Sequence, residues 1–192
     1  MSVVPLRGGP ARETELLQAT LDVLRETGYD RLTVDAVVAR ARASKQTVYR
    51  RWPSKADLVV AAFTDAVSAV PEPPDTGSLR DDLIALLDDL LRELAHLGDV
   101  ISGLVGELRR NPDLAAAMGE GYISTRRTML TTVFERALAR GELAADADVD
   151  LLWQLGPATI FFRALISGEP VDREVTRRLV DHVIVPLARK PG

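Results

Sequence analysis

A cluster of basic side chains is the part of this sequence whose residue types point most directly to a binding chemistry. Residues 36–56 contain no Asp or Glu. The basic residues of this window are Arg40, Arg42, Lys45, Arg50, Arg51 and Lys55. Guanidinium and ammonium groups concentrated in this way on an acidic protein bind phosphate, as nucleic-acid-binding surfaces do. The window therefore predicts a contact with the backbone of a nucleic acid.

The residues around this cluster predict two short helices joined by a tight turn. Thr33 is a potential N-cap for the first helix. The apolar residues that follow it at helical spacing are Val34, Val37, Val38 and Ala41. Ser44 can cap a second helix, which ends at Trp52 because a residue before proline is pushed away from helical angles. Ser54 and Asp57 then form a capping box that starts a third helix. Two short helices connected in this way are typical of a helix-turn-helix.

The stretch A-R-A-S-K-Q-T-V-Y-R-R-W-P-S-K-A-D-L resembles the DNA-binding signature of the TetR family of transcriptional regulators. Ser44, Thr47 and Tyr49 match the core of that signature, and residues 52–55 match the aromatic-Pro-Ser-Lys segment after it. The resemblance implies a sequence-specific DNA-binding protein whose helical body binds a small molecule and forms a homodimer. The family usually has Gly-Val between the two helices, where this chain has Arg42 and an alanine. Glycine adopts left-handed angles at no steric cost, so either Arg42 accepts a strained turn or the turn differs.

Several residues of this region are expected to contact double-stranded DNA. The N-terminal residues of a recognition helix face base edges in the major groove. Lys45 and Gln46 occupy that position, where a long basic side chain pairs with guanine and glutamine pairs with adenine. The residues expected at phosphates are Thr33, Ser44, Thr47, Tyr49, Arg50 and Lys55. Arg42 belongs to the same DNA-binding set. Arg51 either joins it or pairs with an acid, and Trp52 is expected to pack.

The rest of the chain predicts further helices and no strand. Gly28 ends a first helix, Gly98 ends the helix that starts at Ser78, and two glycines interrupt a later helix near residue 120. We expect an all-α fold of about nine helices, with an N-terminal three-helix helix-turn-helix head followed by a larger helical body. The expected parts are a flexible arm (1–9), a DNA-binding domain that includes the connecting helix (10–70), and a ligand-binding and dimerisation domain (78–192).

Charge is divided unevenly along the chain, which has a formal net charge of −4. Residues 1–65 contain ten Lys/Arg and eight Asp/Glu, a net +2, and residues 66–192 contain fourteen and twenty, a net −6. This asymmetry supports a nucleic-acid-binding head and an acidic body. The aspartates expected to be solvated on one helix face of the body are Asp81, Asp82, Asp88 and Asp89.

Two sets of apolar residues are candidate binding surfaces. The residues that could line a pocket for a small, largely hydrophobic effector are Met118, Tyr122, Met129, Phe134, Trp153, Phe161 and Phe162. Each is also consistent with an ordinary core position, because apolar residues at helical spacing are core by default. The residues proposed for a homodimer seam on the last two helices are Leu151, Leu155, Ile166, Val180, Val183 and Ile184. A two-fold dimer would read a palindromic operator.

The composition argues against several other classes of protein. The chain has no Cys and two His, so it offers no thiol nucleophile, no Cys-ligated zinc and no disulfide framework. Phosphate-loop, G-x-S-x-G and H-E-x-x-H motifs are absent, which argues against an enzyme, and no cofactor or metal is expected. No signal peptide and no membrane-spanning run is recognised, so a cytoplasmic location is expected. The alternative to a regulator that represses transcription is a helical interaction protein with a non-functional DNA-binding head.

Overall fold

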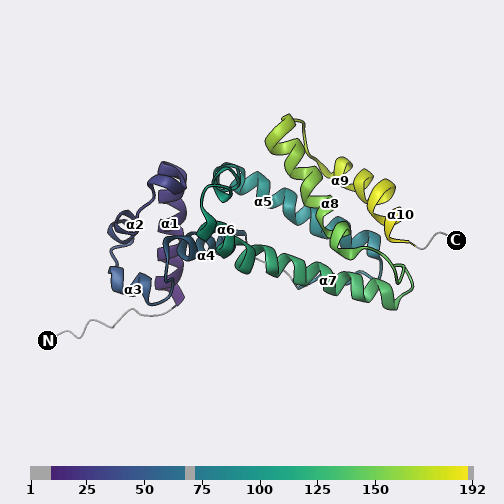
Figure 1. Ribbon diagram of the computed structural model, residues 1–192, viewed down its shortest axis with the longest axis horizontal. Coiled ribbons are helices and arrows are strands. Elements are labelled where there is room, and N and C mark those ends of the chain that lie inside the picture. The colour runs from purple at the N-terminus through teal and green to yellow at the C-terminus, as the bar shows by residue number, and fades with distance from the viewer. Residues whose placement is uncertain (1–9, 68–71, 190–192) are drawn as a thin grey trace. The chain divides into compact units, whose positions relative to one another are not determined.

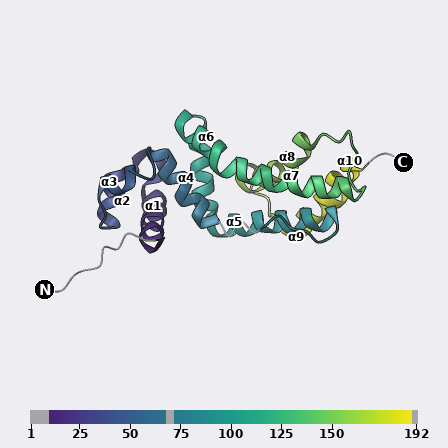
Figure 2. The same ribbon diagram turned by 90° about the horizontal axis from the view of Figure 1, so that it is seen from below.

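The computed structural model describes residues 10–67 and 72–189, and every regular element in those ranges is helical (Figures 1 and 2). The first elements are α1 (Pro10–Arg31), α2 (Val34–Arg40), α3 (Lys45–Tyr49) and α4 (Lys55–Val67). They are followed by α5 (Leu79–Leu108), α6 (Pro112–Met118), the π-helical turn η1 (Gly119–Ile123) and α7 (Ser124–Ala139). The last elements are α8 (Val149–Phe161), η2 (Phe162–Ser167), α9 (Arg173–Leu179), η3 (Val180–Ile184) and α10 (Val185–Ala188). The predicted all-α fold is confirmed.

The described residues form two compact units, which we call the head unit and the body unit. The head unit lies within Met1–Ala69 and Asp99–Ile123, and the body unit within Val70–Gly98 and Ser124–Gly192. The predicted division into 10–70 and 78–192 cuts the chain differently, because α6, η1 and the last part of α5 cluster with the head. The predicted arm and the predicted end of the fourth helix near residue 70 lie outside the described residues.

An apolar core joins α1 to α4 in the head unit. Leu17, Leu21 and Leu24 lie on one face of α1 and are buried, as are Leu58 and Phe63 of α4. Burying a side chain of this kind stabilises the fold by about 1.5–3 kcal/mol relative to leaving it exposed. α1 is interrupted at the predicted glycine, which has a positive φ of 74°. The short helix α2 buries Val34 and Val37 in this unit and α3 buries Val48, which holds both helices in place despite their length.

Gly98 and the two glycines near residue 120 do not end helices as the sequence predicts. α5 continues through Gly98 with a kink at Leu97 (φ −130°, ψ 17°). The buried apolar face continues beyond the glycine at Val100, Ile101 and Leu104. Because that face still finds partners in the head unit, the helix has no reason to stop. The glycines near residue 120 lie in η1, which joins α6 to α7 without a break. The described residues therefore form eight continuous helical segments, close to the number expected.

The body unit has its own apolar core, to which α5, α7 and α8 contribute. Buried residues of this core include Leu83, Leu87, Val133, Phe134, Leu152 and Ile160. Gly156 of α8 lies directly against α5, and a Cβ atom at this position would come within 2.6 Å of Leu87 Cδ2. A residue with a side chain would force Leu87 to move, so the glycine permits the close packing of these two helices.

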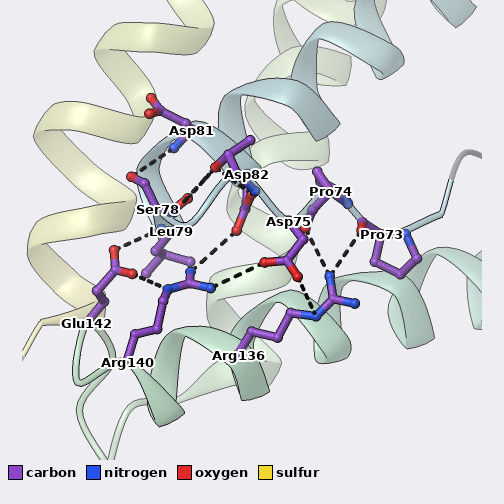
Figure 3. A network of polar contacts seen from close by, with 11 residues as sticks. Pro73, Pro74, Asp75, Ser78, Leu79, Asp81, Asp82, Arg136, Arg140 and Glu142 are labelled. Carbon is purple, nitrogen blue, oxygen red and sulfur yellow. Dashed lines mark hydrogen bonds and ion pairs between the residues drawn. The ribbon is translucent and has the colours of Figure 1, made fainter.

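A polar network fastens the segment before α5 to the end of α7 (Figure 3). Asp82 is fully buried, and its carboxylate accepts hydrogen bonds from the backbone N and the Oγ1 of Thr76, both at 2.7 Å. Arg140 lies 3.4 Å from the same carboxylate. Glu142 accepts a hydrogen bond from the backbone N of Leu79 at 2.8 Å and so caps α5. The prediction that Asp82 is solvated is wrong, because these donors take the place of water around the carboxylate.

The stretch Val149–Ser167, which comprises α8 and η2, is long and apolar enough to cross a membrane by length and composition alone, with a mean hydropathy of 1.2. This corrects the prediction that the chain has no such run. Only 17% of the most apolar 18 residues of this stretch are buried inside the chain. Leu151, Phe162 and Ile166 are among its exposed side chains. The stretch therefore presents an apolar surface that the described residues do not cover.

Candidate nucleic-acid interface

The predicted N-caps of the two short helices are present in the head unit. Thr33 Oγ1 accepts a hydrogen bond from the backbone N of Ala36 at 3.2 Å. Ser44 Oγ accepts one from the backbone N of Thr47, also at 3.2 Å. Each cap satisfies an N–H group that would otherwise lack a partner at a helix start, and losing such a cap costs about 1 kcal/mol. α2 and α3 are the predicted helix-turn-helix, with α3 in the position of the recognition helix.

Arg42 adopts the strained turn that one of the two predicted alternatives requires. Its φ is 50°, and no other non-glycine residue in the described part of the chain has a positive φ. The backbone N of Ala43 donates to the carbonyl of Val38 at 2.9 Å, and that of Arg42 donates to Ala39 at 3.3 Å. These two hydrogen bonds form a Schellman motif, in which glycine usually takes the left-handed position. A left-handed residue with a side chain costs roughly 1–2 kcal/mol at this position.

The helix that follows the motif, α4, begins at the predicted capping box. The backbone N of Ser54 donates to Asp57 Oδ2 at 3.0 Å, and the backbone N of Asp57 donates to Ser54 Oγ at 3.1 Å. Lys55 Nζ donates to the carbonyl of Tyr29 at 3.0 Å and lies 4.2 Å from the centre of the Tyr29 ring. Lys55 therefore ties the start of α4 to the end of α1. Trp52 is buried, as expected of a packing residue.

Most of the residues predicted to contact DNA lie on the surface, on α3 or beside its ends. The exposed members of the set are Thr33, Arg42, Ser44, Lys45, Gln46, Tyr49 and Arg50. Thr47 and Lys55 are half-buried, and the Thr47 hydroxyl lies 2.9 Å from that of Ser44. Lys45 and Gln46 form the exposed first turn of α3. A recognition helix contacts base edges from this turn, so the arrangement suits direct reading of a DNA sequence.

The basic window contains no acidic residue in the sequence, but the fold brings acidic residues from other segments next to it. The ion pairs with acids from outside the window are Arg40 with Glu26 (2.6 Å), Lys45 with Asp35 (2.7 Å) and Arg51 with Glu13. The hydrogen bond to Asp35 raises the pKa of Lys45. Among the described residues, no carboxylate pairs with Arg42 or Arg50. The charge of these two arginines is therefore not neutralised by a described carboxylate, whereas Lys45 is already paired with Asp35.

The predicted ligand-lining residues are divided between the two units. Met118 and Tyr122 lie in the head unit, where the Tyr122 ring meets the Phe63 ring edge to face with centroids 5.0 Å apart. Burial raises the pKa of Tyr122 to about 12, so its hydroxyl stays protonated near neutral pH. The members in the body unit are Met129, Phe134, Trp153, Phe161 and Phe162. Of these, Met129 and Phe134 are buried, Trp153 and Phe161 are partly buried against the core, and Phe162 is exposed.

The residues predicted for a dimer seam fall into two groups. Leu151, Ile166 and Val183 are exposed and Leu155 is half-buried, so they are available to a partner. Val180 and Ile184 are 0% and 2% exposed and belong to the core of the body unit. A side chain enclosed by its own chain does not reach a second copy, so these two residues are corrected from the seam to the core. The predicted set does not include Leu187, which is also exposed on α10.

A capped and exposed recognition helix on a basic surface, joined to a separate helical body, is the architecture of a DNA-binding regulator. Comparison with known proteins supports this class over most of the chain. Residues 16–62 match the family described as bacterial regulatory proteins, tetR family. Residues 73–183 match the tetracyclin repressor-like, C-terminal domain. The chain belongs to the TetR family of transcriptional regulators.

Individual relatives match the chain over nearly its whole length. An uncharacterised HTH-type transcriptional regulator of Mycobacterium tuberculosis is 46% identical over 182 residues, which cover 94% of this chain and 90% of the relative. The DNA-binding transcriptional repressor TetR of Mycobacteroides abscessus is 37% identical, with 96% and 97% covered. The crystal structure of the TetR family transcription regulator SCO0332 superposes with a TM-score of 0.72 at 31% identity, with 90% and 96% covered. Regulators of this family bind DNA operators and typically act as dimers.

Proposed function

We propose that this regulator is a cytoplasmic repressor that binds a near-palindromic operator as a homodimer and leaves it when a small, largely apolar molecule binds. The exposed apolar surface of α8 and η2 carries the proposal, because a second copy would cover it. A two-fold dimer presents two recognition helices, and its operator then shares the two-fold symmetry. The repressor assignment is supported by the 37% identical relative from Mycobacteroides abscessus, which is named as a repressor.

The proposal assigns base recognition to Lys45 and Gln46, at the exposed start of α3. The residues assigned to phosphates are Thr33, Arg42, Ser44, Thr47, Tyr49, Arg50 and Lys55. Arg42 and Arg50 supply charge that no described carboxylate neutralises. Lys45 first leaves Asp35, which costs little because an exposed ion pair of this kind is weak. Binding should therefore be strongly salt-dependent, as counterions are released from the DNA backbone.

The ligand-responsive part of the proposal rests on the apolar residues of the body unit. Met129 and Phe134 belong to its interior, and Trp153 and Phe161 pack beside them. Such a lining favours an apolar, aromatic molecule with few charged groups. Met118 and Tyr122 keep the same proposed role from the head unit, and Phe162 keeps it at the surface.

Selection of bound duplexes from a random DNA pool tests the DNA-binding part of the proposal. A repeated, near-palindromic motif is expected, and a reporter placed behind that motif should be repressed when the protein is present. A pool without any shared motif would contradict sequence-specific binding and favour a helical interaction protein. If a shared motif is found but the protein activates the reporter, the repressor role would be contradicted and sequence-specific binding would stand.

The ligand-responsive part is tested by a screen on the full-length protein bound to the selected duplex. Small aromatic and aliphatic compounds would be scored for release of the duplex and for an increase in the Tm of the free protein, because a ligand that binds only the folded state stabilises it. A compound that does both supports the proposal. A broad apolar library that yields none would contradict an apolar effector.

A further inference from the structure

The strained turn of the helix-turn-helix is held from outside by a residue of α1. We propose that Arg12 is a positioning residue for DNA recognition: it keeps Arg42 in its left-handed conformation and so sets the direction in which α3 leaves α2. The proposal rests on the DNA-binding function and adds a residue that neither the DNA-binding signature nor the basic window contains.

The contact that carries the proposal joins the first turn of α1 to the backbone of the turn. Arg12 Nη2 donates a hydrogen bond to the carbonyl oxygen of Arg42. Its other terminal nitrogen, Nη1, pairs with Glu15 Oε2 at 2.6 Å, and this carboxylate orients the guanidinium. Both arginines line a surface groove of about 850 Å³ between α1 and the end of α2. Arg12 thus connects α1 to the turn that follows α2.

The backbone geometry explains why such a contact matters. If Arg42 relaxed to ordinary helical angles, α2 would extend, and the bond from the backbone N of Ala43 to the carbonyl of Val38 would be lost. Ser44 would then no longer be placed to cap α3. A charged donor on the carbonyl of Arg42 opposes that relaxation, because hydrogen bonds from ionised donors are stronger than neutral ones. Glycine would not need this support, since it adopts left-handed angles without a steric penalty.

The same geometry explains what is gained from an arginine at the turn. The Arg42 side chain is exposed, pairs with no described carboxylate and stands two residues before the cap of the recognition helix. The chain thereby keeps a cation for phosphate at a position whose backbone favours glycine, and Arg12 offsets the strain.

A double-mutant cycle on the full-length protein tests this role. The variants are Arg12→Ala, Arg42→Gly and the combination, each measured against the selected duplex over a range of salt concentrations. Arg12→Ala should weaken binding about tenfold, the change expected when one charge-assisted hydrogen bond is lost. In the Arg42→Gly background the same substitution should change affinity by less than about twofold, because the turn no longer needs support. Arg110→Ala is the matched control, since Arg110 also pairs with a glutamate three residues away in the head unit.

Two further measurements separate positioning from a direct contact with DNA. Arg12→Ala should leave the salt dependence of binding unchanged, and without DNA it should speed hydrogen exchange at the Ala43 amide, with Arg42→Gly restoring protection. An equal loss of affinity in both backgrounds, with a salt slope lower by about 0.9, would show that Arg12 contacts phosphate instead. Unchanged exchange at Ala43 would overturn the positioning role independently of any DNA.

Discussion

Gln46 is the residue whose proposed role is most specific, because a glutamine amide can bond two atoms of one adenine. Replacing Gln46 with Ala should relax the preference at one base position of each half-site by about 1–3 kcal/mol, while affinity for unrelated DNA stays the same. Selection from a random pool, followed by binding to single-base variants of the operator, measures this. Gln18→Ala is the control, since Gln18 bonds to Asp22 within α1. An unchanged preference in the Gln46 variant would remove it from base recognition.

Asp35 is expected to weaken the binding of all DNA sequences alike. It holds Lys45 at 2.7 Å and adds a negative charge beside the recognition helix. Asp35→Asn should therefore raise affinity for non-specific duplexes by no more than about fivefold, because an exposed ion pair is weak. Asp113→Asn on α6 makes the same change of charge at a residue for which the structure gives no ion pair with Lys45. Equal effects of the two substitutions would mean that only net charge matters.

At this scale the sequence predicts backbone contacts better than contacts between side chains. The caps at Thr33 and Ser44 are correct because both partners of each hydrogen bond lie within three residues. The pairing of Arg51 with Glu13 joins residues that are 38 positions apart, and only the packing of α1 brings them together. From the sequence alone, all basic residues of the window would be expected to lack an acidic partner. In the fold, Arg40, Lys45 and Arg51 each pair with one.

At the scale of the helices, the residues predicted for the dimer seam include exposed ones and buried ones, and substitutions at the two kinds should have different effects. Ile166→Glu should give folded monomers that no longer bind the operator, because Ile166 is 74% exposed and its charge would lie in the interface. Val180→Glu should unfold the body unit instead, because an unpaired charge would replace a fully buried side chain. Sedimentation and thermal unfolding of both variants distinguish the two outcomes. A dimeric Ile166 variant would exclude this residue from the seam.

Helix existence follows from the sequence, whereas helix ends and helix faces follow from packing. Gly98 carries the usual signal for a helix end, yet α5 continues because its apolar pattern has partners further on. Val180 and Ile166 are both apolar residues in helical segments, so periodicity alone does not tell which one the body encloses. The buried Asp82 is likewise indistinguishable in sequence from its solvated neighbour Asp81.

For the whole molecule, the proposed release by ligand has a consequence that is independent of the release mechanism. A coupling free energy of 1–3 kcal/mol, typical of allosteric proteins, would lower operator affinity about five- to 150-fold when the ligand is bound. Linkage then requires the operator to weaken ligand binding by the same factor. Titration of a ligand from the screen, with and without the selected duplex, measures both sides. Equal ligand affinity in the two titrations would show that ligand occupancy does not control DNA binding.

The division of α5 between the two units limits how this regulator can be recombined with others. The helix begins in the body unit and ends in the head unit, and the chain returns to the body only after η1. A transplanted fragment made of residues 10–70 would leave behind α6, which packs on α4 and whose Leu114 is fully buried. Hybrid regulators that exchange DNA specificity should therefore carry residues 99–123 with the head, or exchange only the surface residues of α3. The part of this chain that can be exchanged as a unit is therefore defined by how its helices pack, and it consists of two stretches that are separated in the sequence.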